Sequence, residues 1–560
     1  YFEDELTKQV INDLMNIKGY TKTQAQNLLY SGGLKIMTTQ DPGIQNIVDE
    51  EYSDPSNYPD YVQYALDYAL TVKQPDGQEV NYSKEMMKLY FQNEDPSFDL
   101  LFDSQDEGQT YVDRYKANIL ADGSTVVAER VSFAPQPQSA MTIIDQHTGY
   151  VKAIIGGRGT KTASLTLNRA TDSTRQPGST FKIVSTYAAA LNEKGMTLAT
   201  TYEDQPITYD NGAPVNNASG SFNGTTTIRT AIRNSVNTVA VQCFEDVTPE
   251  LGLKYLDNFG FTTLAHGTEA DTDANGNVYT DANLPTALGG LTYGVKNVEL
   301  CAAYAAIANG GNYIKPVYYT KILDHNGNVL IENNSVGRSV IKETTAYLLT
   351  SALEDVVQNG TGTACQLDNM AVAGKTGTTD AYNDLWFVGY TPYYTCAVWS
   401  GYDGNQKIPE GDARNFHKTL WRKVMNRIHQ GMEYKDFEVP DGIEQICICA
   451  DTGLLPRVGC PVTEEYFDVG TMPTEYCDQH FYEYDESQDE DMEIYDANAT
   501  PTPDPENPDG TDNADGSGGD GTGGDGTGGD GTGGDGTGGG DIQYPDESGG
   551  DSGNDDIYYY

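Results

Sequence analysis

The sequence has few basic residues. Its 560 residues include 34 Lys and Arg against 83 Asp and Glu, which gives a formal net charge of −49 at pH 7. The imbalance is strongest in residues 481–560, which contain 23 acidic residues and no Lys or Arg. Nucleic-acid binding requires clustered Lys and Arg to neutralise phosphates, and the sequence has no such cluster. We therefore expect no nucleic-acid partner and interpret the acidity as a solvated surface.

Long apolar runs are also missing. No stretch of 18 or more apolar residues occurs, so we expect no membrane-spanning helix within these residues. The chain begins Tyr1-Phe2-Glu3, without Met and without a signal peptide. We therefore expect it to be a piece of a longer protein that could still carry a membrane anchor. Because 560 residues exceed one ordinary domain, we expect two or three domains plus tails.

Cysteines are few, and the eight that occur fall into two groups. Four are scattered singly, as is typical of buried apolar thiols: Cys243, Cys301, Cys365 and Cys396. The other four lie within 31 residues and are followed by His480: Cys447, Cys449, Cys460 and Cys477. We favour an extracytoplasmic disulfide pair for this second group. The alternatives are free thiols or a zinc site of three of these Cys with His480, since the Cys-x-x-His spacing at 477–480 suits metal binding.

Hydrophobic patterning predicts helices mixed with antiparallel strands. Residues 140–157 form two apolar runs joined by a His147-Thr148-Gly149 turn, which predicts a hairpin. Residues 180–193 follow a polar stretch and predict a helix with one apolar face. We expect further helices at 227–243, 250–258 and 297–308, and strands around 313–323, 370–378, 384–390 and 394–400. The pattern favours an α/β (α+β) fold in which helices flank an antiparallel sheet.

Two Ser-x-x-Lys runs occur, and their surroundings distinguish them. Ser179 follows Gln176-Pro177-Gly178 and begins a helix, where free backbone N–H groups and the helix dipole favour negative charge. Lys182 lies one turn later on the same face, within reach of Ser179. Ser339 and Lys342 instead enclose β-branched residues typical of a strand end. We therefore take Ser179 as the candidate nucleophile and assign Ser339 a surface or capping role.

Two further motifs follow along the chain. Ser235-Val236-Asn237 lies in a turn after a helical stretch, 56 residues beyond Ser179. Lys375-Thr376-Gly377-Thr378 begins 140 residues after Ser235 and continues an apolar strand of small residues. Gly377 would permit a ligand to approach the backbone closely. Each motif alone is weak evidence, but their order and spacing together are specific.

Together these motifs resemble the Ser-x-x-Lys, Ser-Asp-Asn and Lys-Thr-Gly set of penicillin-binding proteins and class A β-lactamases. Val236 stands where that pattern has Asp, and the resulting Ser-x-Asn form is more similar to penicillin-binding proteins. Residues 175–182 are very similar to the nucleophile segment of class A penicillin-binding proteins. Residues 34–41 look like the segment that joins their glycosyltransferase and transpeptidase domains. The resemblance covers roughly residues 30–480, including 289–295, 302–311, 385–392 and 398–403.

The resemblance implies a serine D,D-transpeptidase that cross-links peptidoglycan stem peptides through an acyl-enzyme. Ser179 would attack the carbonyl of D-Ala-D-Ala, and Lys182 would be the general base. That role requires a depressed pKa, which burial and a nearby charge such as Lys375 could provide. Ser235 would relay the proton to the leaving D-Ala. The implied catalytic residues are thus Ser179, Lys182, Ser235 and Lys375, with no cofactor and no metal ligand.

The same resemblance implies how the substrate is bound. Asn237 would hydrogen-bond the substrate backbone, and the backbone N–H groups of Ser179 and Thr378 would form the oxyanion hole. Lys375, Thr376 and Thr378 would hold the terminal carboxylate. The implied substrate-binding residues are Asn237, Thr376, Gly377 and Thr378. β-Lactams mimic the dipeptide and would acylate Ser179.

Resemblance and composition divide the chain into five segments. Residues 1–42 would be the end of a glycosyltransferase domain and a connector, 43–136 a small α+β linker module, and 137–435 the transpeptidase domain. Residues 436–480 would be a Cys-rich module and 481–560 a disordered acidic tail. The intact protein would be bifunctional and anchored by an N-terminal segment at the extracytoplasmic face of the bacterial cell membrane. Cell-division or elongation machinery would be its protein partners.

Two other functions remain open. A β-lactamase-type hydrolase would need a positioned Glu for deacylation, and no convincing Glu motif lies between residues 238 and 374. A β-lactam sensor would keep Ser179 but would not cross-link. The acceptor amine and the oligomeric state do not follow from the sequence.

Overall fold

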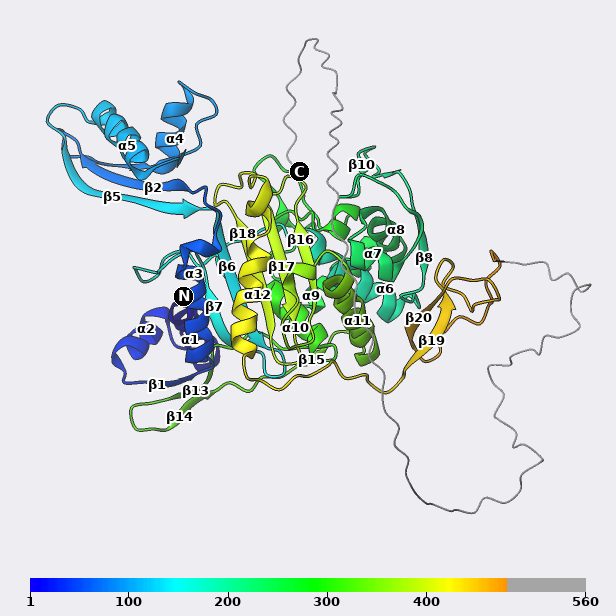
Figure 1. Ribbon diagram of the computed structural model, residues 1–560. Coiled ribbons are helices and arrows are strands. Elements are labelled where there is room, and N and C mark those ends of the chain that lie inside the picture. The colour runs from blue at the N-terminus through cyan, green and yellow to red at the C-terminus, as the bar shows by residue number, and fades with distance from the viewer. Residues whose placement is uncertain (481–560) are drawn as a thin grey trace, which may run out of the picture. The chain divides into compact units, whose positions relative to one another are not determined.

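A computed structural model describes residues 1–480 (Figure 1). The acidic tail predicted for 481–560 lies outside the described residues. Within 1–480, no helix has both the length and the apolar character that a membrane span requires. The segment before the first large sheet contains α1 Phe2–Lys18, α2 Lys22–Ser31, β1 Lys35–Thr38 and α3 Pro42–Ser53.

The first two helices pack on a sheet contributed mostly by distant sequence. Strand β1 pairs antiparallel with β13 Tyr319–Leu323, which pairs in turn with β14 Val329–Glu332. Helices α1 and α2 share a buried core with this sheet, formed by Val10, Leu14, Ala25, Tyr319, Ile322 and Ile331. Residues near the N-terminus thus fold together with residues 319–331.

A separate α+β unit, made of one sheet and two helices, follows within the predicted 43–136 segment. Its strands are β2 Gln63–Lys73, β3 Glu79–Ser83, β4 Leu101–Phe102 and β5 Thr125–Gln136, and β2 pairs antiparallel with each of the others. Helices α4 Lys84–Gln92 and α5 Gln105–Ile119 cover one face of this sheet (Figure 1). The two layers enclose their own aromatic core, which includes Tyr68, Phe91, Phe102 and Tyr115. Helix α3, by contrast, packs on the central sheet.

The central sheet has five antiparallel strands in the order β16-β17-β18-β6-β7. Their bounds are β6 Gln138–Asp145, β7 Tyr150–Ile155, β16 Ala373–Thr378, β17 Asp384–Tyr390 and β18 Thr395–Gly401. All residues of β17 and β18 are buried. Helices lie on both faces, and this arrangement confirms the predicted α/β (α+β) fold with an antiparallel sheet flanked by helices.

Alternate residues of β18 face two different cores. Cys396 and Val398 pack with α3 and with α12 Phe416–His429, which runs along one face of the sheet (Figure 1). Ala397 and Trp399 pack on the opposite face with α10 Asn297–Ala308. Helix α10 is buried along nearly its whole length, as an apolar, Ala-rich helix between two layers must be.

The helices not yet described lie before and after α10 in the sequence. They are α6 Ala188–Glu193, α7 Ile228–Asn234, α8 Asn237–Val247, α9 Pro249–Asn258 and α11 Glu343–Asn359. Three short antiparallel pairs connect them: β8 Thr201–Asp204 with β11 Gly224–Thr227, β9 Ile207–Thr208 with β10 Pro214–Val215, and β12 Asn312–Tyr313 with β15 Arg338–Ser339.

Two elements predicted as continuous are broken. The helix predicted over 227–243 stops at Ser235, whose left-handed backbone (φ 59°) caps α7 before α8 begins at Asn237. The strand predicted over 313–323 is divided into β12 and β13. Pro316 lies between these two strands and has no N–H to donate to a sheet, so pairing cannot run through it.

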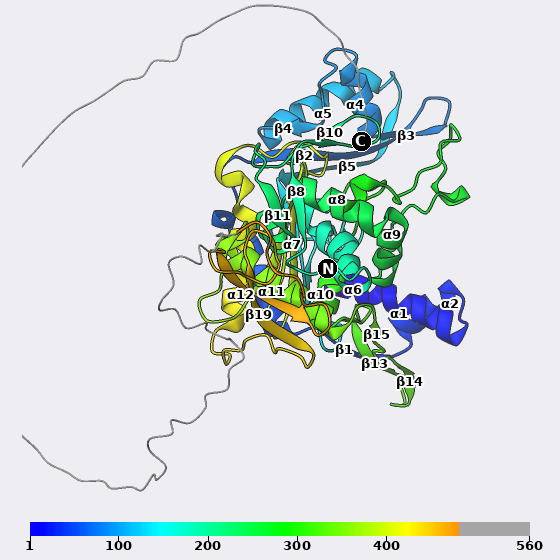
Figure 2. The same ribbon diagram turned by 90° about the vertical axis from the view of Figure 1, so that its right-hand side faces the viewer.

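The last described segment is a hairpin of β19 Ile443–Cys449 and β20 Val462–Asp468 beside α11 (Figures 1 and 2).

One buried ion pair joins this hairpin to α7. The Arg229 guanidinium donates through Nε and Nη2 to the two carboxylate oxygens of Glu465, both at 2.6 Å. Arg229 also donates to the Ser351 carbonyl of α11 at 3.2 Å. The Glu465 side chain is only 4% exposed, so neither charge is well solvated.

We expect Glu465→Ala to destabilise the protein. The substitution leaves the Arg229 guanidinium buried without its carboxylate, which typically costs about 3–5 kcal/mol. Thermal unfolding of the full chain should show a Tm lowered by several degrees. Glu464→Ala is the matched control, because Glu464 is exposed and accepts a hydrogen bond from Gln445 at the surface. Equal Tm values for the two variants would contradict this role for the ion pair.

Candidate active site

A pocket of about 550 Å³ brings the three sequence motifs together. Its lining includes five of the eight predicted site residues: Ser179, Ser235, Asn237, Thr376 and Thr378. Lys182 and Lys375 are fully buried and reach Ser235 with their side-chain nitrogens. Gly377 lies in β16 between two of the lining residues. All eight residues therefore meet at one end of β16.

The nucleophile segment is not a regular α-helix at its start. Ser179 lies in a 3₁₀ turn, Gly178–Thr180, and Lys182–Tyr187 then form a π-helical turn that leads into α6. The sequence predicted a helix from 180, and the irregular winding was not foreseen. Wide π-turns of this kind are often found at functional sites. The Tyr304 hydroxyl of α10 donates to the Thr180 carbonyl at 2.7 Å and holds the turn against α10.

Two glycines allow the nucleophile turn to touch β16 backbone to backbone. Gly178 has φ +54°, and a Cβ there would lie 2.7 Å from the Thr378 carbonyl oxygen. A Cβ on Gly377 would lie 2.5 Å from the Pro177 carbonyl oxygen. In the structure Gly377 makes room for the turn that carries Ser179, and its contact with a ligand stays a prediction. Any side chain at either position would push Ser179 away from the strand.

The Ser235 side chain lies between the two buried lysines. Lys182 Nζ donates to the Ser235 carbonyl at 2.7 Å, to Ser235 Oγ at 3.2 Å and to Asn237 Oδ1 at 2.6 Å. Lys375 Nζ donates to the same Ser235 Oγ at 2.9 Å and to the Thr376 carbonyl at 3.2 Å. One hydroxyl is therefore in contact with both amines, which gives a proton a short path between them.

Burial sets the protonation of these lysines. Burial lowers the pKa of Lys182 well below its ordinary value, and the positive charge of Lys375 lowers it further. Burial also lowers the pKa of Lys375 to about 7. Both effects follow from the cost of holding charge in a poorly solvated site. The lowered pKa increases the fraction of neutral Lys182, and a neutral amine can accept a proton.

The junction of α7 and α8 presents Ser235 and Asn237 to the pocket. Ser235 has a left-handed backbone (φ 59°, ψ 41°), a conformation that costs a residue other than glycine about 1–3 kcal/mol. Val236 is extended, and α8 begins at Asn237. Because the two helices meet in this tight turn, both polar side chains leave the helices at the same point.

Two residues that support this junction escaped the sequence analysis. Asp204, at the end of β8, is buried and accepts hydrogen bonds from Thr238 Oγ1 at 2.6 Å and Asn217 Nδ2 at 2.7 Å. Asn217 Oδ1 in turn accepts from the Asn237 backbone N–H at 2.8 Å. This chain fixes the first turn of α8. Only the three-dimensional contacts reveal it, since Asp204 and Asn217 belong to no recognisable motif.

The second Ser-x-x-Lys run lies away from the pocket. Ser339 belongs to β15, is exposed, and donates its hydroxyl hydrogen to the Ile341 carbonyl at 3.2 Å. Lys342 directly precedes α11, and its backbone N–H donates to Asn192 Oδ1 at 2.8 Å. The geometry agrees with a surface role for Ser339.

All eight cysteines are free thiols in the structure, which corrects the disulfide interpretation that the sequence favoured. The four scattered ones are buried, as expected. In the second group Cys447 is exposed, whereas the other three gather around His480. The spacing along the sequence did not distinguish Cys447 from its neighbours.

Comparison with known proteins places this pocket in a family. The family model described as penicillin binding protein transpeptidase domain matches residues 139–426, and the model described as penicillin-binding protein 1A, C-terminal domain matches 439–482. Penicillin-binding protein 1A of Clostridium tetani is 30% identical over 497 residues, which cover 86% of this chain and 54% of that protein. Penicillin-binding protein 1A/1B of Bacillus subtilis is 29% identical over 383 residues, covering 64% and 39%.

Solved structures share the fold. Penicillin-binding protein 1A of Haemophilus influenzae superposes with a TM-score of 0.59 at 20% identity, covering 85% of this chain and 77% of that one. The PonA1 protein of Mycobacterium tuberculosis in complex with penicillin V gives a TM-score of 0.55 at 22% identity, covering 78% and 96%.

The first listed curated relatives are longer proteins, and this chain spans about half of their length. The transpeptidase model nevertheless covers just over half of this chain and contains every residue of the pocket motifs. The chain therefore belongs to the penicillin-binding proteins, as a class A member that carries their transpeptidase domain.

Proposed function

We propose that the chain is a serine D,D-transpeptidase that joins peptidoglycan stem peptides through an acyl-enzyme on Ser179. The observation that carries this proposal is the contact of Ser235 Oγ with both buried lysines beneath the pocket that Ser179 lines. Family membership supports the same chemistry. The proposal assigns the catalytic roles to Ser179, Lys182, Ser235 and Lys375.

Acylation begins with proton transfer from Ser179 to Lys182. The Ser179 oxygen attacks the carbonyl carbon of the penultimate D-Ala, and its proton goes to the neutral amine of Lys182. The proton then moves through Ser235 Oγ to the nitrogen of the departing D-Ala as the C–N bond breaks. The 3.2 Å contact between Lys182 Nζ and Ser235 Oγ supports this path.

Substrate binding is assigned to the neighbouring polar groups. The backbone N–H groups of Ser179 and Thr378 would stabilise the oxyanion, and the close packing of Gly178 on Thr378 supports their proximity. Lys375 and Thr376 would attract the terminal carboxylate, together with Thr378. Asn237 would hydrogen-bond the peptide backbone. An amine from a second stem peptide then takes the acyl group and closes the cross-link.

A hydrolase of the β-lactamase type is the less favoured alternative. Rapid deacylation requires a carboxylate that activates water at the acyl-enzyme. Among the described residues that line the pocket there is no glutamate, and Asp380 is the lining carboxylate. A β-lactam adduct on Ser179 should therefore be long-lived. A β-lactam sensor would be distinguished by failure to join a stem-peptide donor to an acceptor amine.

The remaining assignments concern the intact protein. We place it at the extracytoplasmic face of the bacterial cell membrane, where peptidoglycan and β-lactams are accessible, and we assign glycan polymerisation to a domain outside these residues. Division or elongation machinery would be its protein partners. The segment boundaries at 42, 136 and 435 also stay predictions.

We expect Ser179→Ala to abolish covalent labelling by a fluorescent penicillin. The variant lacks the hydroxyl that would form the ester, whereas Ser339→Ala alters an exposed hydroxyl away from the pocket and should label like the parent chain. Gel fluorescence after denaturation measures both. Persistent labelling of Ser179→Ala would show that another residue is the nucleophile.

We expect acylation to depend on pH in a bell-shaped manner. With an ordinary pKa, only about one Lys182 side chain in a few thousand would be neutral at pH 7. Because the pKa of Lys182 is lowered well below its ordinary value, the neutral fraction at pH 7 should be larger, and the rate should fall as acidification protonates the amine. Above pH 7, Lys375, with a pKa of about 7, loses its charge and its attraction for carboxylates. Stopped-flow measurement of the second-order acylation constant from pH 5 to pH 10 tests both limbs.

A β-lactam ester provides the control for this profile. The ester lacks the carboxylate, so it should keep the acidic limb and lose the basic limb. A rate that rises about tenfold per pH unit up to pH 10 would instead indicate an ordinary lysine pKa and contradict the assignment of Lys182 as base.

A further inference from the structure

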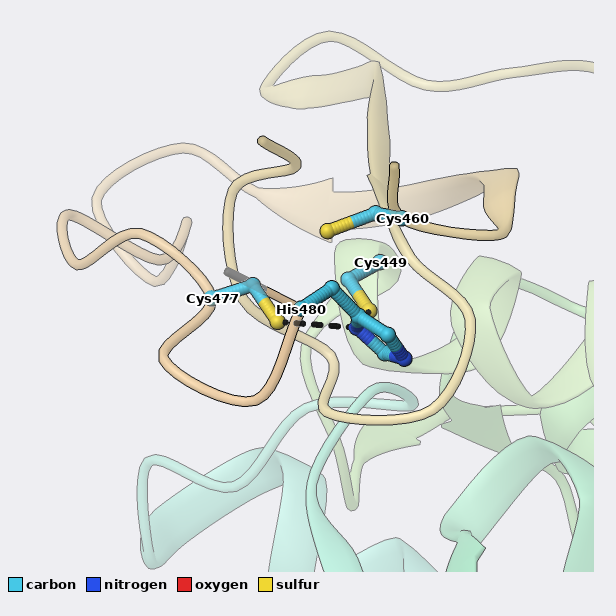
Figure 3. Close-up of side chains that lie close together, drawn as sticks. All are labelled: Cys449, Cys460, Cys477 and His480. Atoms are coloured by element: carbon cyan, nitrogen blue, oxygen red, sulfur yellow. Dashed lines mark hydrogen bonds between the residues drawn. The ribbon is translucent and has the colours of Figure 1, made fainter. Parts of the chain in front are cut away.

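Three cysteines and one histidine converge at the tip of the C-terminal hairpin. Cys449, Cys460, Cys477 and His480 each point one potential ligand atom into the same small space (Figure 3). These four atoms all lie within 4.8 Å of one another. None of them belongs to the transpeptidase pocket. Such a set of donors is unusual unless something holds them together, since three thiols gain little from mutual contact.

From this arrangement we propose that Cys449, Cys460, Cys477 and His480 form a structural Zn²⁺ site. Tetrahedral zinc with Zn–S of about 2.3 Å and Zn–N of about 2.0–2.1 Å places neighbouring ligand atoms about 3.5–3.8 Å apart. His480 Nδ1 lies 3.2 Å from Cys477 Sγ and 3.5 Å from Cys449 Sγ, close to that spacing. Soft thiolates with one imidazole are a donor set that selects zinc over magnesium or calcium.

The groups around the four ligands are those a zinc site needs. His480 Nε2 lies 3.2 Å from the Asp451 carboxylate, so its N–H can donate there and leave the Nδ1 lone pair directed at the cluster. A carboxylate behind a ligating histidine fixes the tautomer and ring orientation. The Arg457 backbone N–H donates to Cys460 Sγ at 3.2 Å, a contact that stabilises a thiolate.

Backbone hydrogen bonds hold the ligands in place from three separate segments. Cys449 ends β19, Cys460 lies two residues before β20, and Cys477 donates its N–H to the Leu455 carbonyl at 2.8 Å. Ala450 donates to the Pro461 carbonyl at 2.8 Å, which brings the ends of the two strands together. The site is therefore preformed, and metal would add a further link between segments that these hydrogen bonds already join.

The hairpin also has little hydrophobic core of its own. Its buried apolar residues are Ile448 and Phe467, which pack on Ala199 of the preceding domain. Small modules with so little buried apolar surface commonly depend on a disulfide or a metal for stability. A disulfide would use two of the three thiols and leave the third thiol and His480 without a role. Zinc accounts for all four.

Four protein ligands close the coordination sphere, so the zinc is structural and holds no substrate. Binding converts three thiols to thiolates and releases their protons to solvent. The bound metal would stabilise the hairpin whose Glu465 pairs with Arg229 of α7. Cys447 takes no part, because it is exposed and lies outside the cluster.

Metal analysis of the full chain tests the site. Protein purified with reductant and without chelator should contain about one zinc per chain, as four protein ligands for one ion require. His480→Ala and Cys477→Ser should each lose most of this zinc, whereas the matched control Cys447→Ser should keep it. Fluorescent penicillin labelling of each variant shows that the transpeptidase domain is still folded, so that metal loss is not simply unfolding.

Cobalt substitution gives an independent readout. Co²⁺ added to the metal-free full chain should produce thiolate charge-transfer bands and the ligand-field bands of a tetrahedral site, and one equivalent of Zn²⁺ should abolish both. Three results would overturn the proposal: zinc-free protein that binds no Co²⁺, a disulfide among Cys449, Cys460 and Cys477 in peptide mass spectra of the native chain, or equal zinc loss in Cys447→Ser and Cys477→Ser.

Discussion

The geometry of the pocket depends on two buried lysines that share one serine hydroxyl. Lys182 and Lys375 are both fully buried, and both donate to Ser235 Oγ. Two ammonium groups so close and so poorly solvated repel each other, and burial disfavours the charge on each. The surrounding fold must supply the stability that this site gives up, and it does so with a sheet covered on both faces and with α10, which is buried nearly throughout.

Each partner of the shared hydroxyl comes from a different structural layer. Lys375 belongs to β16 at the edge of the central sheet, Lys182 to the π-turn that leads into α6, and Ser235 to the α7–α8 junction. The contact of Gly178 with Thr378 sets the distance between the first two layers. The hydrogen bonds that Asp204 and Asn217 accept fix the position of the third layer, the α7–α8 junction. The geometry around Ser179 thus depends on packing between layers more than on any single loop.

The sequence alone predicted those strands and site residues that depend on a local pattern or on the order of short motifs. The strand predicted around 384–390 coincides with β17, and the order of three short motifs brought out the eight site residues that the structure places together. The sequence placed Ser235 in a turn, but the single helix predicted over 227–243 was wrong, because the residues on both sides favour helix and the left-handed residue depends on tertiary contacts. Asp204 was missed for the same reason. The sequence spacing could not show that Cys447 lies outside the cluster of the other three cysteines. That distinction depends on the burial of each thiol, which only the structure gives.

The ion pair between Glu465 and Arg229 means that the boundary of the transpeptidase family match is not a boundary of the folded unit. The match ends at residue 426, yet the carboxylate that neutralises Arg229 comes from residue 465. A protein shortened after the matched region would lose both this carboxylate and the strand that contacts Arg229 on α7, the helix that ends at Ser235. Any change that removes the hairpin therefore also changes the surroundings of Arg229, and with them the helix that presents Ser235 to the pocket.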